Sequence, residues 1–553
     1  MNTVDVTLPN GTSRTVAYGT RCHELIEVDR ESDAMRRPLA ALVNNDLVSL
    51  SFKVEVNATI EPVYLDSPLG LRTYRQTLCF VLAMASTRLF SDSRLVIGHS
   101  LGDGYYYHFP DGDDPTEEDV RALEQCMRDL AGSRLPITRH VLSYSDALEH
   151  FTAAHMPDTA ALLSHRNDTK IAVYECDGYI DLSHGPLAPN TEVLRQFRLR
   201  RYGEGIILRF PGSADPYSLG EFRDIPVIFS VYQEYKEWGR VLKVRAAGDL
   251  NDLTRQKQIE EFIQVAEALH EKKIAEISDR IHSRERRARV VLIAGPSSSG
   301  KTTFTKRLAI QLRVHGLSPA MISLDDYFLP RDQTPRDADG NYDFESIRAI
   351  DVNALNRDLL ELFAGEEVDL PSFNFKTGER EFSGTTLSLR DDGILLIEGI
   401  HGLNDELTPR IDAEQKYKVY VSALTQLNVD DHNRIPTTDN RLVRRMVRDY
   451  QFRGHSALDT LTMWPSVRRG ENDYIFPFQN SADSAFNSAL DYELGVLRAR
   501  AYPLLQQIKP FHEVYHEATR LLSFLDNFLP IRETYVPANS ILREFIGGSR
   551  FHY

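Results

Sequence analysis

The sequence predicts an α/β protein whose C-terminal part, residues 288–553, forms a parallel sheet with helices on both faces. Two observations predict this fold. Short, continuous apolar runs alternate with amphipathic helical patterns from residue 288 onward, which is typical of a sheet buried on both faces. The segment GPSSSGKT at 295–302 follows one of these runs and precedes a helical pattern, as a phosphate-binding loop requires. Different patterns before residue 250 predict two smaller domains in front of this sheet.

Residues 1–62 predict a small β-rich domain. Apolar and polar residues alternate in short runs, which the pairs Asn10-Gly11 and Asn44-Asn45 interrupt. Such pairs favour tight hairpin turns. Residues 63–250 predict an α+β domain, because 71–90 has helical periodicity while 170–183 and 203–212 have the composition of strands.

Residues 251–287 contain neither glycine nor proline and predict one long linking helix, which Asn251 or Asp252 caps. Its apolar residues fall mostly on one face, so a coiled-coil homo-oligomer is an open alternative. These apolar residues are Ile259, Phe262, Ile263, Ala266, Leu269, Ile277 and Ile281.

The bulk composition excludes several classes of protein. The formal net charge of −16 at pH 7 disfavours nonspecific binding to nucleic acid or to an anionic membrane. The four cysteines are scattered without a CxxC pair, so we expect free thiols in a reducing compartment. The N-terminus lacks a signal-peptide pattern, and no apolar stretch approaches the ~18–20 residues that span a bilayer. These features predict a cytoplasmic protein without a membrane partner.

The segment 295–302 matches the pattern G-x-x-x-x-G-K-[ST]. We expect its backbone N–H groups to hold phosphate oxygens, Lys301 to reach the terminal phosphates of ATP, and the Thr302 hydroxyl to bind Mg²⁺. The chain contains no Lys-x-Asp, so the base-recognition motif of GTPases is absent. The predicted ATP-binding residues of the loop are Gly295, Pro296, Ser297, Ser298, Ser299, Gly300, Lys301, Thr302 and Thr303.

Several carboxylates follow predicted strands, where open α/β sheets bind ligands. Asp325, with Asp326 behind it, is the candidate base that takes a proton from an acceptor hydroxyl. Glu398 ends a later strand and is a candidate to hold Mg²⁺ through water. Asp343 and Glu345 follow a glycine-containing loop and are candidates for holding a sugar hydroxyl, although a helix cap is the open alternative.

An arginine-rich helical pattern occupies 441–453. Its arginines cannot all share one helix face, but several could line a lid that closes over a triphosphate. A solvated basic helix is the alternative. The arginines are Arg441, Arg444, Arg445, Arg448 and Arg453.

From 288 to about 500, the order of these motifs resembles the uridine kinase / phosphoribulokinase family of P-loop kinases. The resemblance implies that Asp325 is the catalytic base, that Asp343 binds a ribose, and that Thr302 and Glu398 belong to the metal site. We predict Asp325 as a third residue of this Mg²⁺ site. We further predict that Lys301, Arg445 and Arg448 are catalytic and that Arg453 binds ATP. Phe373, Arg380 and Arg444 are the remaining predicted substrate-binding residues.

One departure from that family concerns the acceptor. Uridine kinases carry a Tyr and a His in the segment that matches 370–380, where this chain has Phe373 and Gly378. A phenylalanine can still stack on a base, but the hydrogen-bond partner is gone, so discrimination is expected to be lost. The acceptor is therefore predicted to be a nucleoside, uridine-like or other, or a related sugar.

The preceding segments resemble parts of threonyl-tRNA synthetases. Residues 1–62 look like a TGS domain, and 63–250 resemble the second additional domain, on the stretches RLVIGHSLGDGYYYHF and YIDLSHGPLAPNT. The family's editing chemistry uses two His in a helix, and a Cys and a His in a later segment. These places hold Gln76, Phe80, Ser183 and Leu187, so we expect a retained fold without editing chemistry.

The sequence thus predicts an ATP- and Mg²⁺-dependent kinase that acts on a small hydroxyl acceptor. The first alternative is a tRNA- or ribosome-associated protein with an ATP-driven switch. In such a protein, the basic stretch 195–203 could contact RNA locally. A phosphoribulokinase-type enzyme ranks lower, because only Arg331, Arg336 and Arg348 could hold the phosphate of its acceptor.

Overall fold

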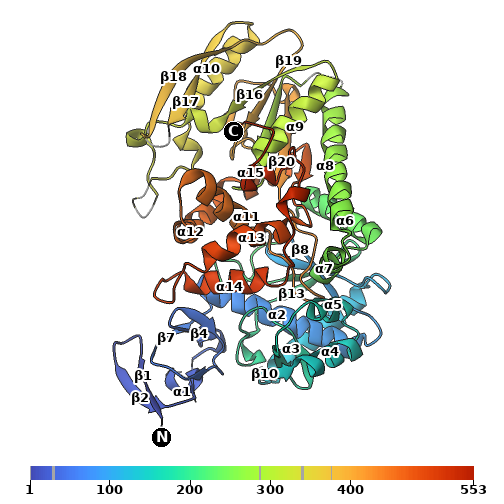
Figure 1. Ribbon diagram of the computed structural model, residues 1–553, viewed down its shortest axis with the longest axis vertical. Coiled ribbons are helices and arrows are strands. Elements are labelled where there is room, and N and C mark those ends of the chain that lie inside the picture. The colour runs from blue at the N-terminus through green and yellow to red at the C-terminus, as the bar shows by residue number, and fades with distance from the viewer. Residues whose placement is uncertain are drawn as a thin grey trace.

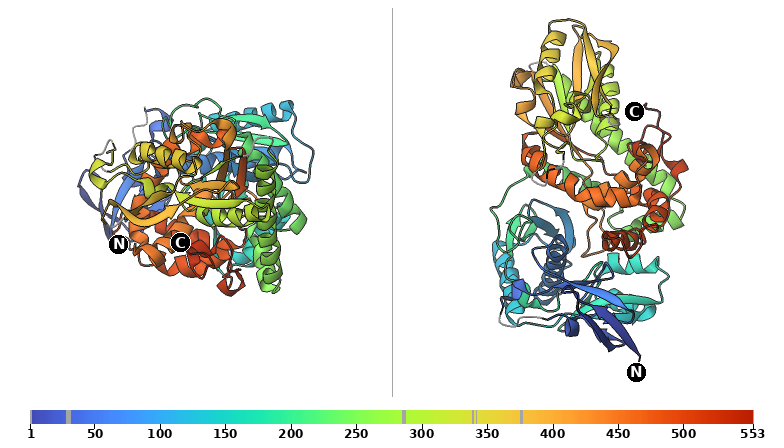
Figure 2. Two further views of the ribbon diagram at one scale, coloured as in Figure 1. Left: turned by 90° about the horizontal axis from the view of Figure 1, so that it is seen from above. Right: turned by 90° about the vertical axis from the view of Figure 1, so that its left-hand side faces the viewer.

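The computed structural model describes residues 2–27, 32–284, 288–337, 340, 342–374 and 377–552. The molecule is elongated, with the N-terminal strands at one end of its long axis and the hairpin β17–β18 at the other (Figures 1 and 2). No helix in the described ranges is both long and apolar enough to cross a membrane.

The N-terminal sheet has the strand order β2-β1-β7-β4-β5. Its predicted turn at Asn44-Asn45 is confirmed, since both residues have positive φ (49° and 61°) and directly join β4 to β5. The hairpin of β1 and β2 turns at Gly11, with φ of 77°. The elements are β1 (Thr3–Thr7), β2 (Ser13–Ala17), β3 (Thr20–Arg21), α1 (Cys22–Leu25), β4 (Ala40–Val43), β5 (Asp46–Val48), β6 (Lys53–Val54) and β7 (Ala58–Val63).

The next part is α+β, with a four-stranded sheet of order β13-β14-β9-β8 and a three-stranded sheet of order β10-β11-β12. The long helix α2 runs through its core, as its apolar composition predicts. The elements are α2 (Pro68–Leu89), β8 (Val96–Ser100), β9 (Gly104–His108), α3 (Glu117–Gly132), β10 (Thr138–Ser143), α4 (Tyr144–Ala153), α5 (Pro157–Ser164), β11 (Lys170–Cys176), β12 (Tyr179–Asp181), β13 (Arg198–Tyr202), β14 (Gly205–Arg209) and α6 (Pro226–Leu242).

The prediction of one continuous helix over 251–287 is wrong. The structure has two helices, α7 (Ala247–Arg255) and α8 (Ile259–His282), which are separated at Lys257 with φ of 61°. Asn251 lies inside α7 and is no cap, because its side chain bonds the backbone of residues 527 and 529. The apolar face of α8 packs into the core of the same chain, which argues against a coiled coil. Residues 285–287 lie outside the described part.

The C-terminal part is built on a parallel sheet of order β16-β19-β15-β20-β21, as predicted. Alternate residues of β15 enter different apolar clusters, one with α8 and α9 and the other with α10, so helices cover both faces. The elements are β15 (Val290–Ala294), α9 (Lys301–Val314), β16 (Ser318–Ser323), α10 (Val352–Phe363), β17 (Val368–Asn374), β18 (Glu379–Leu387), β19 (Gly393–Glu398), β20 (Lys416–Ser422) and β21 (Ser484–Asn487).

The remaining helices pack below this sheet, and the C-terminus returns beside α9 (Figure 1). A five-residue π-helix, Asp449–Arg453, continues α11. The helices are α11 (Thr437–Arg448), α12 (Ala457–Tyr474), α13 (Glu493–Leu505), α14 (Tyr515–Leu525) and α15 (Arg543–Ile546).

Candidate active site

The phosphate-binding loop joins the end of β15 to the start of α9. A side chain at Gly295 would collide with the backbone oxygen of Val421, at 1.9 Å from an ideal Cβ. Gly300 has φ of +82° and lies against Ile541, so the loop needs glycine at both places. The Lys301 ammonium donates to the carbonyl oxygens of residues 295 and 296, at 2.9 and 3.2 Å. The lysine is therefore held at the mouth of the loop.

A carboxylate and a hydroxyl meet beside this lysine. The Thr302 hydroxyl donates to Glu398 Oε1 at 3.0 Å. Glu398 ends β19, between β15 and β16, so the sheet itself brings it to the loop. Burial raises the pKa of Glu398 to about 7, with Asp325 and Glu544 adding to the effect against the ammonium of Lys301. These oxygens have the hard-donor chemistry that suits Mg²⁺.

Asp325 follows β16 in a short 3₁₀ turn, where its N–H donates to the Ser323 hydroxyl. Its side chain is solvent-exposed, and the surrounding protein raises its pKa while Lys301, Arg453 and Arg448 oppose that shift. The charges of three cations therefore act on this one carboxylate. Asp326 turns away and accepts from the N–H of residue 373 at 3.3 Å.

Three of the predicted lid arginines gather around one acid. The buried carboxylate of Asp449 lies 3.1 Å from Arg445, 3.2 Å from Arg448 and 3.5 Å from Arg453. Arg445 also donates to the Ser297 hydroxyl of the phosphate-binding loop at 2.8 Å. Sequence reasoning missed Asp449, although it is the one acid within the arginine-rich segment.

The other two arginines of this segment are buried, and the prediction that Arg444 contacts substrate is not supported. Arg444 is fully buried, pairs with Glu493 and donates to the backbone of residue 488. Arg441 pairs with the buried Glu471 and donates to the Ser297 carbonyl at 3.0 Å. Arg441, Arg444 and Arg445 lie at i, i+3 and i+4 on one helix face, which agrees with the expectation that the five arginines do not all share a face. All three side chains donate hydrogen bonds to residues 297 or 298 and so stabilise the phosphate-binding loop.

Asp343 is the acid predicted to hold a sugar hydroxyl. Its carboxylate accepts from the Tyr474 hydroxyl at 3.1 Å and from the N–H of Glu345 at 3.2 Å. Burial raises the pKa of Glu345 to about 7, and its carboxyl also senses the charges of Glu471, Arg445, Lys301 and Asp325. Glu345 therefore lies within reach of the charges at the phosphate-binding loop. Tyr474 was not predicted, because it lies more than a hundred residues away on α12.

Phe373 and Arg380 support the acceptor region instead of facing it. Phe373 is only 7% exposed and packs against Phe328, with ring centroids 5.7 Å apart. Arg380 donates to Asp351 at 3.0 Å and to the carbonyls of residues 327 and 328. The predictions of direct substrate contact at these two residues are therefore not supported. An ideal Cβ on Gly378 would lie 2.8 Å from the Arg331 guanidinium, so an arginine covers that position.

A residue of the C-terminal segment also reaches the loop. Glu544, on α15, accepts from the Thr303 N–H at 3.2 Å and from its hydroxyl at 2.7 Å. These donors belong to the first turn of α9, which a phosphate-binding loop directs at nucleotide phosphates. No motif marks Glu544 in the sequence.

The N-terminal half holds the positions that match the synthetase editing site. Phe80 and Leu187 are buried in its core, and the Ser183 hydroxyl donates to the carbonyl of residue 185. The neighbouring His184 lies 3.0 Å from Asp430 of the C-terminal half. Within the described ranges, no three His, Cys, Asp or Glu side chains gather as a metal site would require.

Comparison with known proteins bears on the part that contains this loop. Residues 290–494 match the model of the phosphoribulokinase / uridine kinase family. Among solved structures, a possible uridine kinase from Bacillus stearothermophilus is 23% identical, covers 39% of this chain and 98% of its own, and has a TM-score of 0.27. A D-glycerate 3-kinase from Cryptococcus neoformans is 16% identical, with 49% and 87% covered and a TM-score of 0.19.

The N-terminal region is similar to threonine--tRNA ligases. That of Desulfovibrio desulfuricans is 37% identical over 155 residues, which are 28% of this chain and 24% of the ligase. Threonine--tRNA ligase 2 of Bacillus subtilis is 32% identical over 202 residues, 36% of this chain and 31% of the ligase. The chain thus spans only about a quarter to a third of the length of these curated relatives.

Proposed function

We propose that the chain is an ATP-dependent kinase that phosphorylates a hydroxyl of a nucleoside or a related sugar. The observation that carries the proposal is the meeting of Lys301, Thr302 and Glu398 at the phosphate-binding loop, where the charges of Lys301, Arg448 and Arg453 also act on Asp325. A phosphoryl-transfer site needs cations for the transferred group and a carboxylate for the acceptor proton, side by side. The family match over 290–494 supports the same reaction class.

Each group then has one task. The amides of the loop and Lys301 hold the ATP phosphates, while Arg445, Arg448 and Arg453 offset the negative charge of the group in transfer. Asp325 accepts the proton of the acceptor hydroxyl. Thr302 and Glu398, next to Asp325, are the residues that would hold Mg²⁺, an ion that neutralises charge on the bridging phosphate oxygens when bound.

The acceptor is proposed to lie between Asp325 and Asp343. Tyr474 fixes the Asp343 carboxylate, which leaves its remaining lone pairs for hydroxyl groups of a sugar. A phosphorylated acceptor is disfavoured, because the Arg336 guanidinium bonds its own loop at the carbonyl of Gly340 and lies over the Tyr342 ring. Arg336 is thereby engaged within its own loop.

The test is a screen of ATP consumption over nucleosides and sugars, with Lys301→Ala as the blank. Once an acceptor is found, Asp325→Ala is expected to lower kcat by roughly 10²–10⁴, since a general base contributes about that much. Asp332→Ala is the matched control, because this nearby acid is exposed and outside the site. Near-normal turnover of Asp325→Ala would contradict the assignment of the base.

A further inference from the structure

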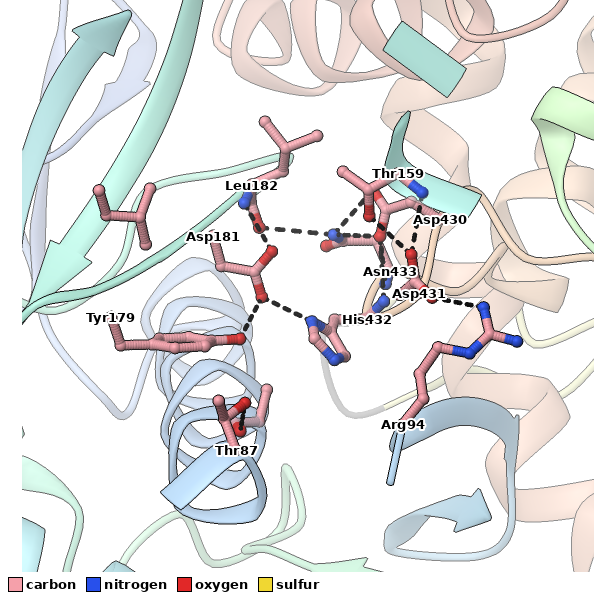
Figure 3. Close-up of polar contacts among 12 residues, drawn as sticks. Thr87, Arg94, Thr159, Tyr179, Asp181, Leu182, Asp430, Asp431, His432 and Asn433 are labelled. Atoms are coloured by element: carbon pink, nitrogen blue, oxygen red, sulfur yellow. Dashed lines mark hydrogen bonds and ion pairs between the residues drawn. The ribbon is translucent and has the colours of Figure 1, made fainter. Parts of the chain in front are cut away.

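A loop of the C-terminal part reaches into the N-terminal part. Residues 423–436, between β20 and α11, bring buried polar groups against elements more than two hundred residues earlier. Asp431 lies 2.8 Å from Arg94, and the His432 ring lies 2.7 Å from Asp181 (Figure 3). The loop is therefore fixed at a junction that both parts of the chain build.

The same loop carries Arg434, which lies close to Arg75 of α2. The Arg434 guanidinium lies over the ring of Tyr105, 4.9 Å from its centroid, and Arg75 lies over Phe210 at 4.6 Å. The two rings contact each other edge to face, with centroids 4.7 Å apart. Two cations thus stand side by side on one aromatic pair.

These cations lack the partners that buried guanidinium groups normally have. In the described part of the chain, neither Arg75 nor Arg434 forms an ion pair, and the Nε atom of each is buried without a hydrogen-bond partner. Arg75 donates once, to the carbonyl of residue 211 at 2.9 Å. Asp103 is the acid whose charge reaches Arg75, but it does not pair with it. Burial lowers the pKa of Arg75, and the charge of Arg434 lowers it further.

The next residue along α2 also has an unsatisfied side-chain atom. The Gln76 side chain follows Arg75 on α2 and lies against Gly185, and its Oε1 atom is buried with no donor among the residues described. Buried polar atoms are normally satisfied in folded proteins, so each of these atoms is open to a ligand or an ion. Consecutive residues of a helix do not face each other, so the two positive charges of Arg75 and Arg434 alone define what a ligand between them must carry.

We propose that Arg75 and Arg434 form a binding site for the phosphate group of a small molecule. The two guanidinium groups match the charge of a phosphate dianion and can each bond it in a fork. The site is separate from the phosphate-binding loop and needs both parts of the chain, because Arg434 comes from the loop before α11. A ligand there would tie that loop to α2.

The test is calorimetric titration of inorganic phosphate into the Lys301→Ala protein. This substitution is chosen because it weakens phosphate binding at the loop of 295–302. Saturable binding is expected to remain, and adding Arg434→Gln is expected to weaken it about tenfold or more, the loss of one charge-assisted bond. Arg200→Gln is the matched control. The Arg200 guanidinium also lies over an aromatic ring, that of Phe222, but Arg200 is exposed and lies outside the proposed site. Sodium acetate replaces phosphate in a second titration and is expected to bind more weakly.

The outcomes separate the alternatives. Unchanged affinity in the Arg434→Gln variant, or no binding to the Lys301→Ala protein, overturns the site. Acetate binding as tight as phosphate overturns the charge match. If Arg434→Gln lowers the melting temperature sharply, Arg75→Gln replaces it under the same criteria. Since binding is read directly, the result stands whether or not the chain proves to be a kinase.

Discussion

The buried pair of Arg441 and Glu471 offers a direct test of how the phosphate-binding loop is supported. The side chains are 1% and 0% exposed, and Glu471 also accepts from the Ser297 N–H at 3.1 Å. Burial opposes ionisation of Glu471, but Arg441 and Arg468 together lower its pKa, so it is ionised at neutral pH. Glu471→Gln removes this charge and keeps an oxygen for Ser297.

The expected loss follows from the burial. Arg441 stays buried without a counter-charge, which destabilises a protein by about 3–5 kcal/mol. Urea denaturation is expected to show this as a midpoint about 1–2 M lower, for an m-value of about 3 kcal/mol/M. Trp464 lies 5.5 Å from the Arg441 guanidinium, and the chain has one other tryptophan, so Trp238→Phe leaves a fluorescent probe at the site.

Two controls make the result decisive. Glu237→Gln breaks an exposed pair with Arg240 and is expected to leave the midpoint nearly unchanged. Replacing both Arg441 and Glu471 by Met is expected to recover much of the loss, because no charge is then left buried. If Glu471→Gln shifts the midpoint no more than Glu237→Gln does, the reasoning is refuted.

Three further predictions concern other parts of the chain. Glu544→Gln is expected to strengthen ATP binding several-fold in calorimetry, since a negative charge leaves the phosphate-binding amides; an equal gain for adenosine would contradict this. Arg453→Ala is expected to lower kcat about 10²-fold at an unchanged melting temperature, whereas Arg444→Ala lowers the melting temperature; a reversed pattern would exchange their roles. Burial opposes the charge of His432, but Asp181 and the neighbouring acids raise its pKa to about 9. The ion pair of His432 and Asp181 stabilises the fold fully below about pH 6.5, the pKa of histidine in the unfolded chain, and this stabilisation is lost as pH rises through 9. The melting temperatures of wild type and His432→Gln should therefore converge near pH 9. A difference that stays constant with pH would exclude this ion pair.

Local signals in the sequence predicted much of the fold. The turn at Asn44-Asn45, the strand β15 and the helix α9 each depend on neighbouring residues, so their patterns are legible without tertiary information. The break at Lys257 was missed for the same reason. A lysine with positive φ has no sequence signature, and on either side of this break the helices pack against different neighbours, α7 against α5 and α8 against α9.

The candidate site could be predicted only in part. Lys301, Asp325 and Glu398 follow strands of a parallel sheet, and the topology alone brings them together. The fates of Arg444 and Arg445 could not be predicted, because they are neighbours in sequence. One pairs with Glu493 in the core and the other reaches the hydroxyl of Ser297. That difference depends on which acid each meets, from elements far along the chain.

The least predictable feature is that the two parts of the chain share one core. Ile207 and Tyr106 of the N-terminal part lie in the same apolar cluster as Ala294 and Tyr420, the latter on β20. Ala294 is the last residue of β15, directly before the phosphate-binding loop. Removing the N-terminal part would expose this apolar cluster and the buried Asp431 to solvent. Exposing apolar surface costs free energy, so the C-terminal part alone is expected to be less stable. The synthetase-like part therefore serves as packing beneath the candidate active site, whatever else it binds.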